Sequence, residues 1–162
     1  MPQLILLRHA KTEPGGPAGR DFDRALTERG RSDAAIIGQV LAEQGLAPDL
    51  ALVSTARRAV ETWEAAKPAL PGVEAQMEPA LYHATVERLA MIAAAQSAQR
   101  LLIIGHNPGL HEYALDLVGG YDPAGRLAGF PTATAAVFEG EALGPARLVH
   151  LFLVRDHGGG AQ

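Results

Sequence analysis

Two histidines follow apolar runs that have the length of buried strands. Arg8 and His9 come directly after the run 4–7, and His106 follows the run 101–104 within the segment Gly-His-Asn-Pro-Gly. In open α/β sheets, ligands bind beyond the carboxyl ends of the strands, so we expect both histidines in one site. Arg8 adds a permanent positive charge beside them. The sequence therefore predicts an anion site, and phosphate is the leading candidate.

An unprotonated His9 has the chemistry of a nucleophile toward phosphorus. A neutral imidazole can attack phosphorus and carry the phosphoryl group as a covalent intermediate. Neighbouring cations disfavour the imidazolium form, and a hydrogen bond from the other ring nitrogen to a backbone carbonyl would fix the tautomer. Arg8 and a second arginine would hold the phosphoryl oxygens in forked contacts, while His106 can donate to the same oxygens. This scheme requires no metal ion and no other cofactor.

The second arginine is expected from the segment 54–62, which follows a third apolar run. Ser54 or Thr55 can cap a helix at this point. Position 58 lies one helical turn beyond Ser54 and shares its face, whereas position 57 is rotated by roughly 100°. We therefore expect Arg58 in the site and Arg57 outside it.

Two further residues are candidates for the same site. Glu78 follows the strand expected at 73–77 and is either a general acid for the leaving group or an ordinary loop carboxylate. Asn107 lies beside His106 and is a candidate phosphate ligand. A metal site is not predicted, because His106 and His111 are five positions apart rather than at the helix-face spacing of metal-binding pairs.

Apolar runs alternate with amphipathic segments along the first 120 residues. Strands are expected at residues 3–7, 50–53, 73–77 and 101–104, and helices at about 27–45, 54–67, 85–96 and 109–119. The first, second and fourth runs are continuously apolar, which is typical of parallel strands buried on both faces. Beyond Gly120, strands at 132–138 and 147–154 are expected to be antiparallel at one edge. The pattern predicts a three-layer α/β/α sandwich with a mainly parallel sheet.

The length of 162 residues and the composition indicate one domain. We expect it to span residues 1–157, with a flexible glycine-containing tail at 158–162 and a loop at 14–19. The net charge of −4 offers no basic face for nucleic acid, and no apolar stretch has the length of a membrane span. The chain has no cysteine, which fits a reducing compartment. We expect a cytoplasmic protein with neither nucleic acid nor membrane as partner.

In the order and spacing of these motifs, the chain resembles the histidine phosphatase superfamily, which includes the phosphoglycerate mutases. Arg8 and His9, followed by alanine, are similar to its Arg-His-Gly or Arg-His-Ala signature. Ser54 to Arg58 is similar to its pattern of serine, three residues and arginine, and His106 to its later strand-end histidine. The resemblance implies that His9 is the phosphorylated nucleophile. It also implies that both arginines and His106 bind the phosphoryl group.

Among the subfamilies, the chain is most similar to the short bacterial phosphohistidine phosphatases, through the segment DRALTERG at 23–30. The mutases carry an acidic proton donor in a stretch that soon reaches glycine, whereas Glu78 is followed by Pro-Ala-Leu-Tyr. An imidazole leaves phosphorus more readily than an alkoxide does, and His106 could protonate it. The chain also has little length for a lid. These points favour a metal-independent phosphatase of protein phosphohistidine, with a signalling or carrier protein as substrate.

Two alternatives stay open at this point. One is a phosphatase of small phosphorylated metabolites, and the other is a phosphate-binding regulatory domain without turnover. Mutase activity is disfavoured by the missing lid and by the absence of a clear acid. Testing the purified protein on a phosphohistidine protein and on phosphomonoesters would distinguish these hypotheses.

Overall fold

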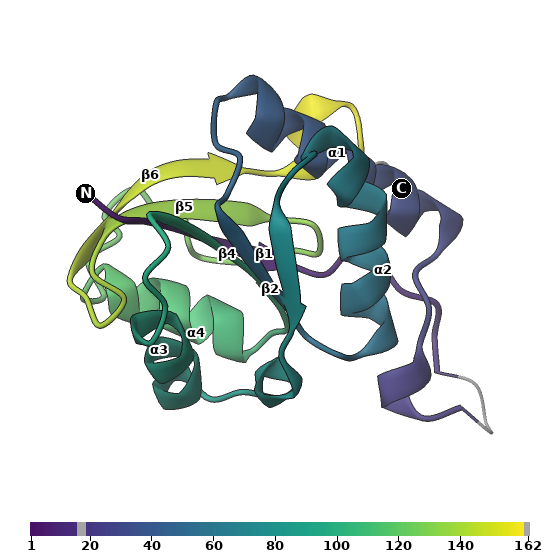
Figure 1. The fold of residues 1–162 in the computed structure, drawn as a ribbon, viewed down its shortest axis with the longest axis horizontal. Coiled ribbons are helices and arrows are strands. Elements are labelled where there is room, and N and C mark those ends of the chain that lie inside the picture. Colours follow the sequence, from purple (N-terminus) through teal and green to yellow (C-terminus); the bar gives the residue numbers. More distant parts are fainter. Residues whose placement is uncertain (16–18, 161–162) are drawn as a thin grey trace.

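The computed structural model describes residues 1–15 and 19–160 (Figure 1). Its strands are β1 (Gln3–Arg8), β2 (Leu50–Val53), β3 (Glu74–Met77), β4 (Arg100–Gly105), β5 (Ala135–Gly140) and β6 (Ala146–Phe152). Its α-helices are α1 (Glu28–Glu43), α2 (Arg57–Ala66), α3 (Val86–Ala94) and α4 (Gly109–Leu117). Single 3-10 turns at Asp21–Asp23 and Pro79–Leu81 lie in the connections that reach the site.

The strands form one mixed sheet in the order β3-β2-β4-β1-β5-β6. β3, β2, β4 and β1 are parallel, and β5 is antiparallel to both β1 and β6. Helices α1 and α2 pack on one face of the sheet, and α3 and α4 pack on the other (Figure 1). The protein is therefore a three-layer α/β/α sandwich with an antiparallel edge, as the sequence predicts.

Side chains of the central strand β1 serve two hydrophobic cores, because successive residues of a strand point to opposite faces. Ile5 and Leu7 pack with α1 and α2, whereas Leu4 and Leu6 pack with α3 and α4. All four are buried. Close packing on both faces holds the end of β1, and with it the residues that follow, in one position.

The start of α1 agrees with the sequence. The Thr27 side chain accepts a hydrogen bond from the backbone N–H of Gly30, as expected for an N-cap. A Cβ at Gly30 would collide with the carbonyl of Lys11, so this turn of the helix packs directly on the segment after β1. The glycine of the DRALTERG segment is thereby explained by a close approach of two backbones.

The start of α2 differs from the prediction. The helix begins at Arg57 with Ala56 as its N-cap, and no side chain caps it. The expected cap at Ser54 or Thr55 is therefore wrong. The Ser54 hydroxyl instead accepts a hydrogen bond from the N–H of Ala56 and bonds the ring of His106.

The first strand after α4 also begins later than predicted, at Ala135 rather than residue 132. The preceding residues close a turn against the end of β1. The Ala133 N–H donates to the carbonyls of Arg8 and His9, and the Arg8 N–H donates to the carbonyl of Thr134. This turn thus fixes the backbone of the Arg-His pair.

The end of the chain is hydrogen-bonded as far as the structure describes it. The Gly159 N–H donates to the Val154 carbonyl, and the Gly160 N–H donates to the Asp33 carboxylate of α1 at 3.0 Å. Residues 158–160 of the predicted flexible tail therefore contact the domain. Residues 161–162, and residues 16–18 of the predicted loop 14–19, lie outside the described part. None of the described helices has both the length and the apolar character that a membrane crossing requires.

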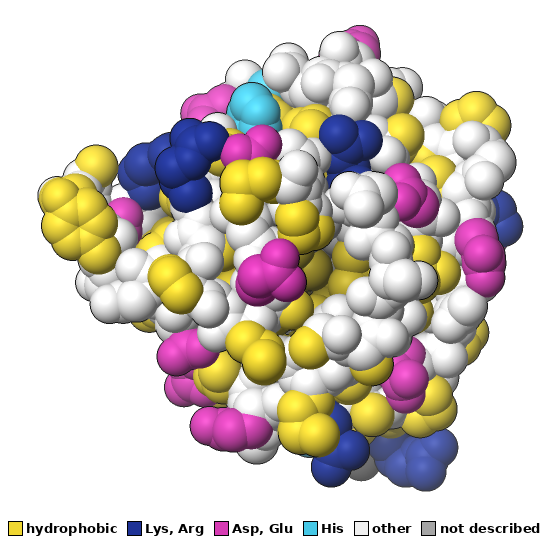
Figure 2. All heavy atoms as spheres, turned by 60° about the vertical axis from the view of Figure 1, so that its left-hand side comes forward, with side chains coloured by type: hydrophobic (Ala, Val, Ile, Leu, Met, Phe, Trp, Pro, Cys, Tyr) yellow, Lys and Arg dark blue, Asp and Glu magenta, His cyan; other side chains and the backbone are white. Residues whose placement is uncertain are grey.

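A hollow opens at the amino ends of β1 and β4. Its lining includes Pro2, Leu4, Ala93 and Leu143. Figure 2 looks toward the side of the molecule where the amino terminus lies, and shows charged side chains of both signs interspersed with hydrophobic ones. The two histidines follow the carboxyl ends of the same strands. This hollow therefore lies at the opposite end of these strands from the histidines.

Candidate active site

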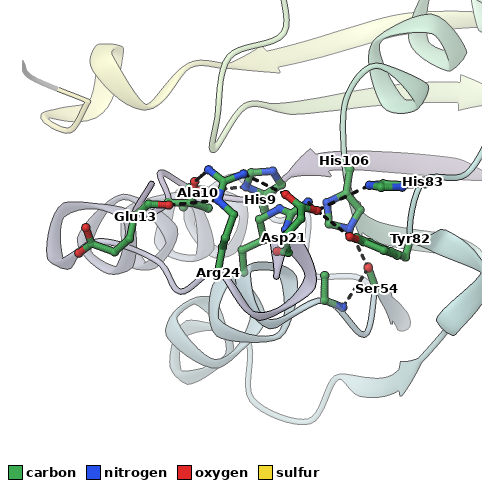
Figure 3. A network of polar contacts seen from close by, with 12 residues as sticks. His9, Ala10, Glu13, Asp21, Arg24, Ser54, Tyr82, His83 and His106 are labelled. Carbon is green, nitrogen blue, oxygen red and sulfur yellow. Dashed lines mark hydrogen bonds and ion pairs between the residues drawn. The ribbon is translucent and has the colours of Figure 1, made fainter. Parts of the chain in front are cut away.

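Three neighbouring strands, β2, β4 and β1, end at the same edge of the sheet, and a polar side chain follows each. These side chains are Ser54, His106 and the pair Arg8 and His9. The ring centroids of His9 and His106 lie 5.3 Å apart, and each histidine is only 6% exposed (Figure 3). The structure therefore brings together the two histidines that the sequence places at separate strand ends.

His9 is held as a free base with a defined tautomer. Its Nδ1 donates to the backbone carbonyl of Ala10 at 2.8 Å, which leaves Nε2 without a proton. Burial lowers the pKa of His9 to about 4. The bond to Ala10 opposes this shift, and the charges of Arg58, Arg8 and Arg24 add to it. At neutral pH the Nε2 atom is thus available as a nucleophile.

His106 is also neutral, and its second nitrogen is free. Its Nε2 lies 2.7 Å from the Ser54 hydroxyl. Since this hydroxyl already accepts a hydrogen bond from Ala56, its own hydrogen can be donated to Nε2, which leaves the ring proton on Nδ1. Burial, and then the charges of His9 and Arg58, lower the pKa of His106 to about 3. A neutral His106 can therefore donate one hydrogen bond from Nδ1.

Arg8 and Asn107 share one anchor. The Arg8 Nη1 and the Asn107 Nδ2 both donate to the Phe130 carbonyl, at 3.1 and 2.9 Å. Burial, and then the charge of Arg58, lower the pKa of Arg8, which shows that the two arginines lie close enough to repel. The predicted phosphate ligand Asn107 thus has one amide hydrogen committed to the protein.

Arg58 and Arg57 separate as expected, although for a different reason. Arg58 is 5% exposed and lies beside the histidines, whereas Arg57 is largely exposed and pairs with Glu61 at 2.9 Å. Ser54 precedes the helix, so counting one helical turn from it is not valid. Arg58 reaches the site as the second residue of α2.

A cluster around Asp21 was not found by the sequence analysis. Arg58 Nη1 donates to the backbone carbonyl of Asp21 at 2.8 Å, and its Nη2 donates to the Asp21 carboxylate at 3.0 Å. The Tyr82 hydroxyl donates to the same carboxylate at 2.6 Å, and Arg24 Nη1 does so at 3.1 Å (Figure 3). Arg24 lies in the DRALTERG segment, but nothing in the sequence distinguishes Asp21 from Asp23 as its partner.

Thr62 connects the helix of Arg58 to the loop of His9. Its hydroxyl donates to the Arg58 carbonyl at 2.7 Å and accepts from the Ala10 N–H at 3.0 Å. Thr62 is fully buried. Thr62 is the last residue of the segment 54–62 and couples the two elements.

The Glu78 carboxylate is engaged by its own turn. It accepts a hydrogen bond from the Ala80 N–H at 3.0 Å and so caps the short turn Pro79–Leu81. Within residues 1–15 and 19–160, no hydrogen bond or ion pair joins Glu78 to either histidine or to the two arginines. Its predicted role as general acid therefore has no geometric support in this conformation.

Several buried polar atoms at the site have no hydrogen-bond partner in the described protein. Three of them belong to the candidate residues: the N–H donors Arg8 Nε and Arg58 Nε, and His106 Nδ1, which carries the ring proton when Nε2 accepts from Ser54. An unsatisfied buried donor costs about 1–3 kcal/mol, so a group of three requires an explanation. Nitrogen donors on two cations and a neutral imidazole suit an oxyanion rather than a metal ion.

The family follows from a sequence comparison. The profile of the histidine phosphatase superfamily (branch 1) matches residues 4–100, which include the segments of His9 and Arg58. The chain belongs to this superfamily. The resemblance seen in the sequence is thereby confirmed.

Solved structures of SixA proteins extend the similarity over nearly the whole chain. The SixA protein of Agrobacterium tumefaciens is 35% identical, with a TM-score of 0.85 and coverage of 94% of this chain and 99% of that one. The SixA protein of Nakamurella multipartitia is 29% identical, with a TM-score of 0.81 and coverages of 94% and 95%. The protein histidine phosphatase SixA complexed with tungstate is 21% identical, with a TM-score of 0.82 and coverages of 95% and 98%, and shares the fold.

A curated relative is an uncharacterized chloroplastic protein of Arabidopsis thaliana. It is 35% identical over 129 residues, which are 72% of this chain and 59% of the relative. The chain thus matches less than two thirds of that longer relative.

Proposed function

We propose that this histidine phosphatase hydrolyses phosphohistidine in proteins, without a metal ion, through a phosphorylated His9. The observation that carries the proposal is the state of His9, whose Nε2 is an unprotonated base because Nδ1 donates to Ala10 and burial disfavours the imidazolium. The buried Arg58, the half-buried Arg8 and His106 lie near it, and each has a buried nitrogen without a hydrogen-bond partner in the described residues. This arrangement would provide a nucleophile and an oxyanion cradle in one place.

The reaction has two displacements on phosphorus. In the first, His9 Nε2 forms a bond to phosphorus while the bond from phosphorus to the substrate imidazole breaks, and the departing nitrogen takes up a proton. In the second, the oxygen of a water molecule bonds to phosphorus, and the electron pair of the N–P bond returns to Nε2. The proton lost by this water passes to solvent.

Charge stabilisation is the main contribution expected from the protein, because phosphoryl transfer requires little other chemistry from it. Arg8 and Arg58 would donate to the equatorial oxygens, where negative charge is spread in the transition state. His106 would donate from Nδ1 either to an oxygen or to the leaving nitrogen. Each of these groups is fixed before substrate arrives, by Phe130, Asp21 and Ser54.

The leaving group supports phosphohistidine over an alkyl phosphate. An alkoxide needs a good general acid, and the Glu78 carboxylate is engaged by the backbone of Ala80 instead. An imidazole leaves with less assistance. The 35% identity to the SixA protein of Agrobacterium tumefaciens, which carries the name of a phosphohistidine phosphatase, supports the same substrate class.

The decisive experiment compares substrates and cofactors together. Purified protein is tested against a phosphohistidine carrier protein and a panel of phosphomonoesters, with and without a chelator. We expect the phosphohistidine to be hydrolysed fastest, no effect of the chelator, and inhibition by vanadate, which mimics five-coordinate phosphorus. Preference for a phosphomonoester would instead indicate a metabolite phosphatase. Activity that is lost on chelation and restored by a divalent ion would refute the metal-independent mechanism.

A further inference from the structure

We propose that Asp21 is a positioning residue for Arg58, which it turns so that the Nε edge of the guanidinium faces the phosphoryl site. This proposal rests on the part of the proposed function in which Arg58 binds a phosphoryl group. It does not depend on which group leaves phosphorus.

The hydrogen bonds of Arg58 show which edge is committed. A guanidinium has five N–H donors in one plane and offers two bidentate edges, one formed by both Nη atoms and one by Nε with Nη2. Asp21 occupies the first edge, because its backbone carbonyl takes Nη1 at 2.8 Å and its carboxylate takes Nη2 at 3.0 Å. Arg58 Nε is buried and has no partner within the described residues. The Nε edge is therefore the one left for an oxyanion.

Asp21 is itself held from two other segments. The Tyr82 hydroxyl donates to its Oδ2 at 2.6 Å, and Arg24 donates to its Oδ1 at 3.1 Å (Figure 3). Arg24 is anchored in turn by the Glu13 carbonyl at 3.1 Å. The hydrogen bond from Tyr82, followed by those from Arg24 and Arg58, keeps the pKa of Asp21 well below its usual range, so the group is a carboxylate. An anchored carboxylate can impose an orientation on the guanidinium that it binds.

The charge of Asp21 has a second consequence for the arginine pair. Burial is the larger cause of the lowered pKa of Arg8, and the nearby positive charge of Arg58 adds to it. A carboxylate on the far edge of Arg58 partly offsets the repulsion between the two arginines. Asp21 thus favours the close approach of two cations that a phosphoryl group requires.

The opposite role for Asp21 makes the opposite prediction. A carboxylate that competed with substrate for Arg58 would block the site, and its removal would tighten the binding of oxyanions. The unpaired Nε edge favours positioning, because Asp21 leaves it free. Removal of Asp21 should weaken oxyanion binding if Asp21 positions Arg58, and should tighten it if Asp21 competes with substrate.

The test replaces Asp21 by Asn and uses Asp23→Asn as its control. Asp23 lies in the same 3-10 turn but pairs only with the exposed Arg20 among the described residues. We measure inhibition by vanadate, and kcat and KM for p-nitrophenyl phosphate. D21N should weaken vanadate inhibition and lower kcat/KM by roughly ten- to a hundred-fold, since small misplacements of a positioning group have effects of this size. D23N should stay within about two-fold of wild type.

A double mutant distinguishes positioning from a general loss of structure. If Asp21 acts through Arg58, D21N should produce little further loss in an Arg58→Ala background. Damage to the loop as a whole would lower kcat/KM by similar factors in both backgrounds, and that result would overturn the proposal. Tighter vanadate binding by D21N would also overturn it.

The same measurements separate this proposal from the proposed function. A wild-type protein that is inhibited by vanadate but inactive on phosphohistidine would refute the substrate assignment and leave the Asp21 comparison valid. A wild-type protein that vanadate does not inhibit would refute both.

Discussion

The carboxyl ends of four parallel strands lie on the same side of the molecule, but the side chains that follow them make two different kinds of contact. Side chains at the ends of β1, β2 and β4 form the histidine cluster, which has buried nitrogens without hydrogen-bond partners in the described part of the chain. The side chain after β3 is Glu78, and it bonds the backbone two residues further on. The carboxyl ends of the strands thus mark where the histidines gather, although not every side chain at those ends joins the cluster.

Burial explains the difference between these strand ends. β4 and most of β1 and β2 are buried, whereas all four residues of β3 are exposed because β3 is the edge strand beside β2. Packing on both faces fixes the direction of the side chains that follow the inner strands. After β3 the chain satisfies its polar groups locally. Functional side chains are thus expected at the ends of the inner strands β1, β2 and β4 and not at the end of the edge strand β3. The following predictions test this difference.

The largest effect is expected at the end of β1. His9→Ala removes the proposed nucleophile and should abolish turnover. In the wild-type protein, brief incubation with labelled substrate should trap a phosphoenzyme that is labile in acid and stable in base, as N–P bonds are. The variant should trap none. Full activity of His9→Ala would eliminate the covalent mechanism.

The next effect concerns the arginine that follows β2. Arg58→Ala should lower turnover on the order of 10²-fold or more, comparable to the loss of an oxyanion donor. Arg58→Lys should also be impaired, because a point charge does not replace a planar fork. Arg57→Ala is the matched control and should stay within a few-fold of wild type, since its guanidinium is exposed and pairs with Glu61. Exchange of the two results would mean that the wrong arginine has been placed in the site.

The neutral state of His9 predicts how stability depends on pH. Its pKa is about 4 in the folded protein and about 6.5 when it is unfolded, so between these values the unfolded chain binds more protons. The free energy of unfolding should therefore fall as the pH decreases from 6.5 to 4, by about 1.4 kcal/mol for each unit of pKa difference. Urea denaturation at several pH values measures this slope. His9→Ala should reduce it, and an unchanged slope would show that His9 is not buried as a neutral ring.

The sequence predicts those parts of the site that depend on local patterns. Apolar runs locate the strands, and the polar residues immediately after them locate Arg8, His9 and His106. The contact between Asp21 and Tyr82 could not be predicted, because it joins positions 61 residues apart in the sequence through two short turns.

The misplaced start of α2 has a similar cause. Ser54 has the residue type of an N-cap, but its hydroxyl bonds a histidine 52 residues later in the chain. Local preference for a cap thus yields to a tertiary contact at the site. Such departures are expected at functional sites, where a side chain serves the ligand or the nucleophile before its own helix.

The smallest effect is expected at the end of β3. Glu78→Gln should leave the hydrolysis of a phosphohistidine protein within about two-fold of wild type, in keeping with a surface substitution away from the chemistry. Glu87→Gln is the control, because Glu87 is exposed and lines the same surface cavity as Glu78. Both variants are also tested on an alkyl phosphate, whose alkoxide leaving group depends on an acid. If Glu78→Gln alone lost activity on the alkyl phosphate, Glu78 would have to swing from the Ala80 N–H toward the leaving group. The end of the edge strand β3 would then contribute a functional side chain during turnover, although it does not do so in this conformation.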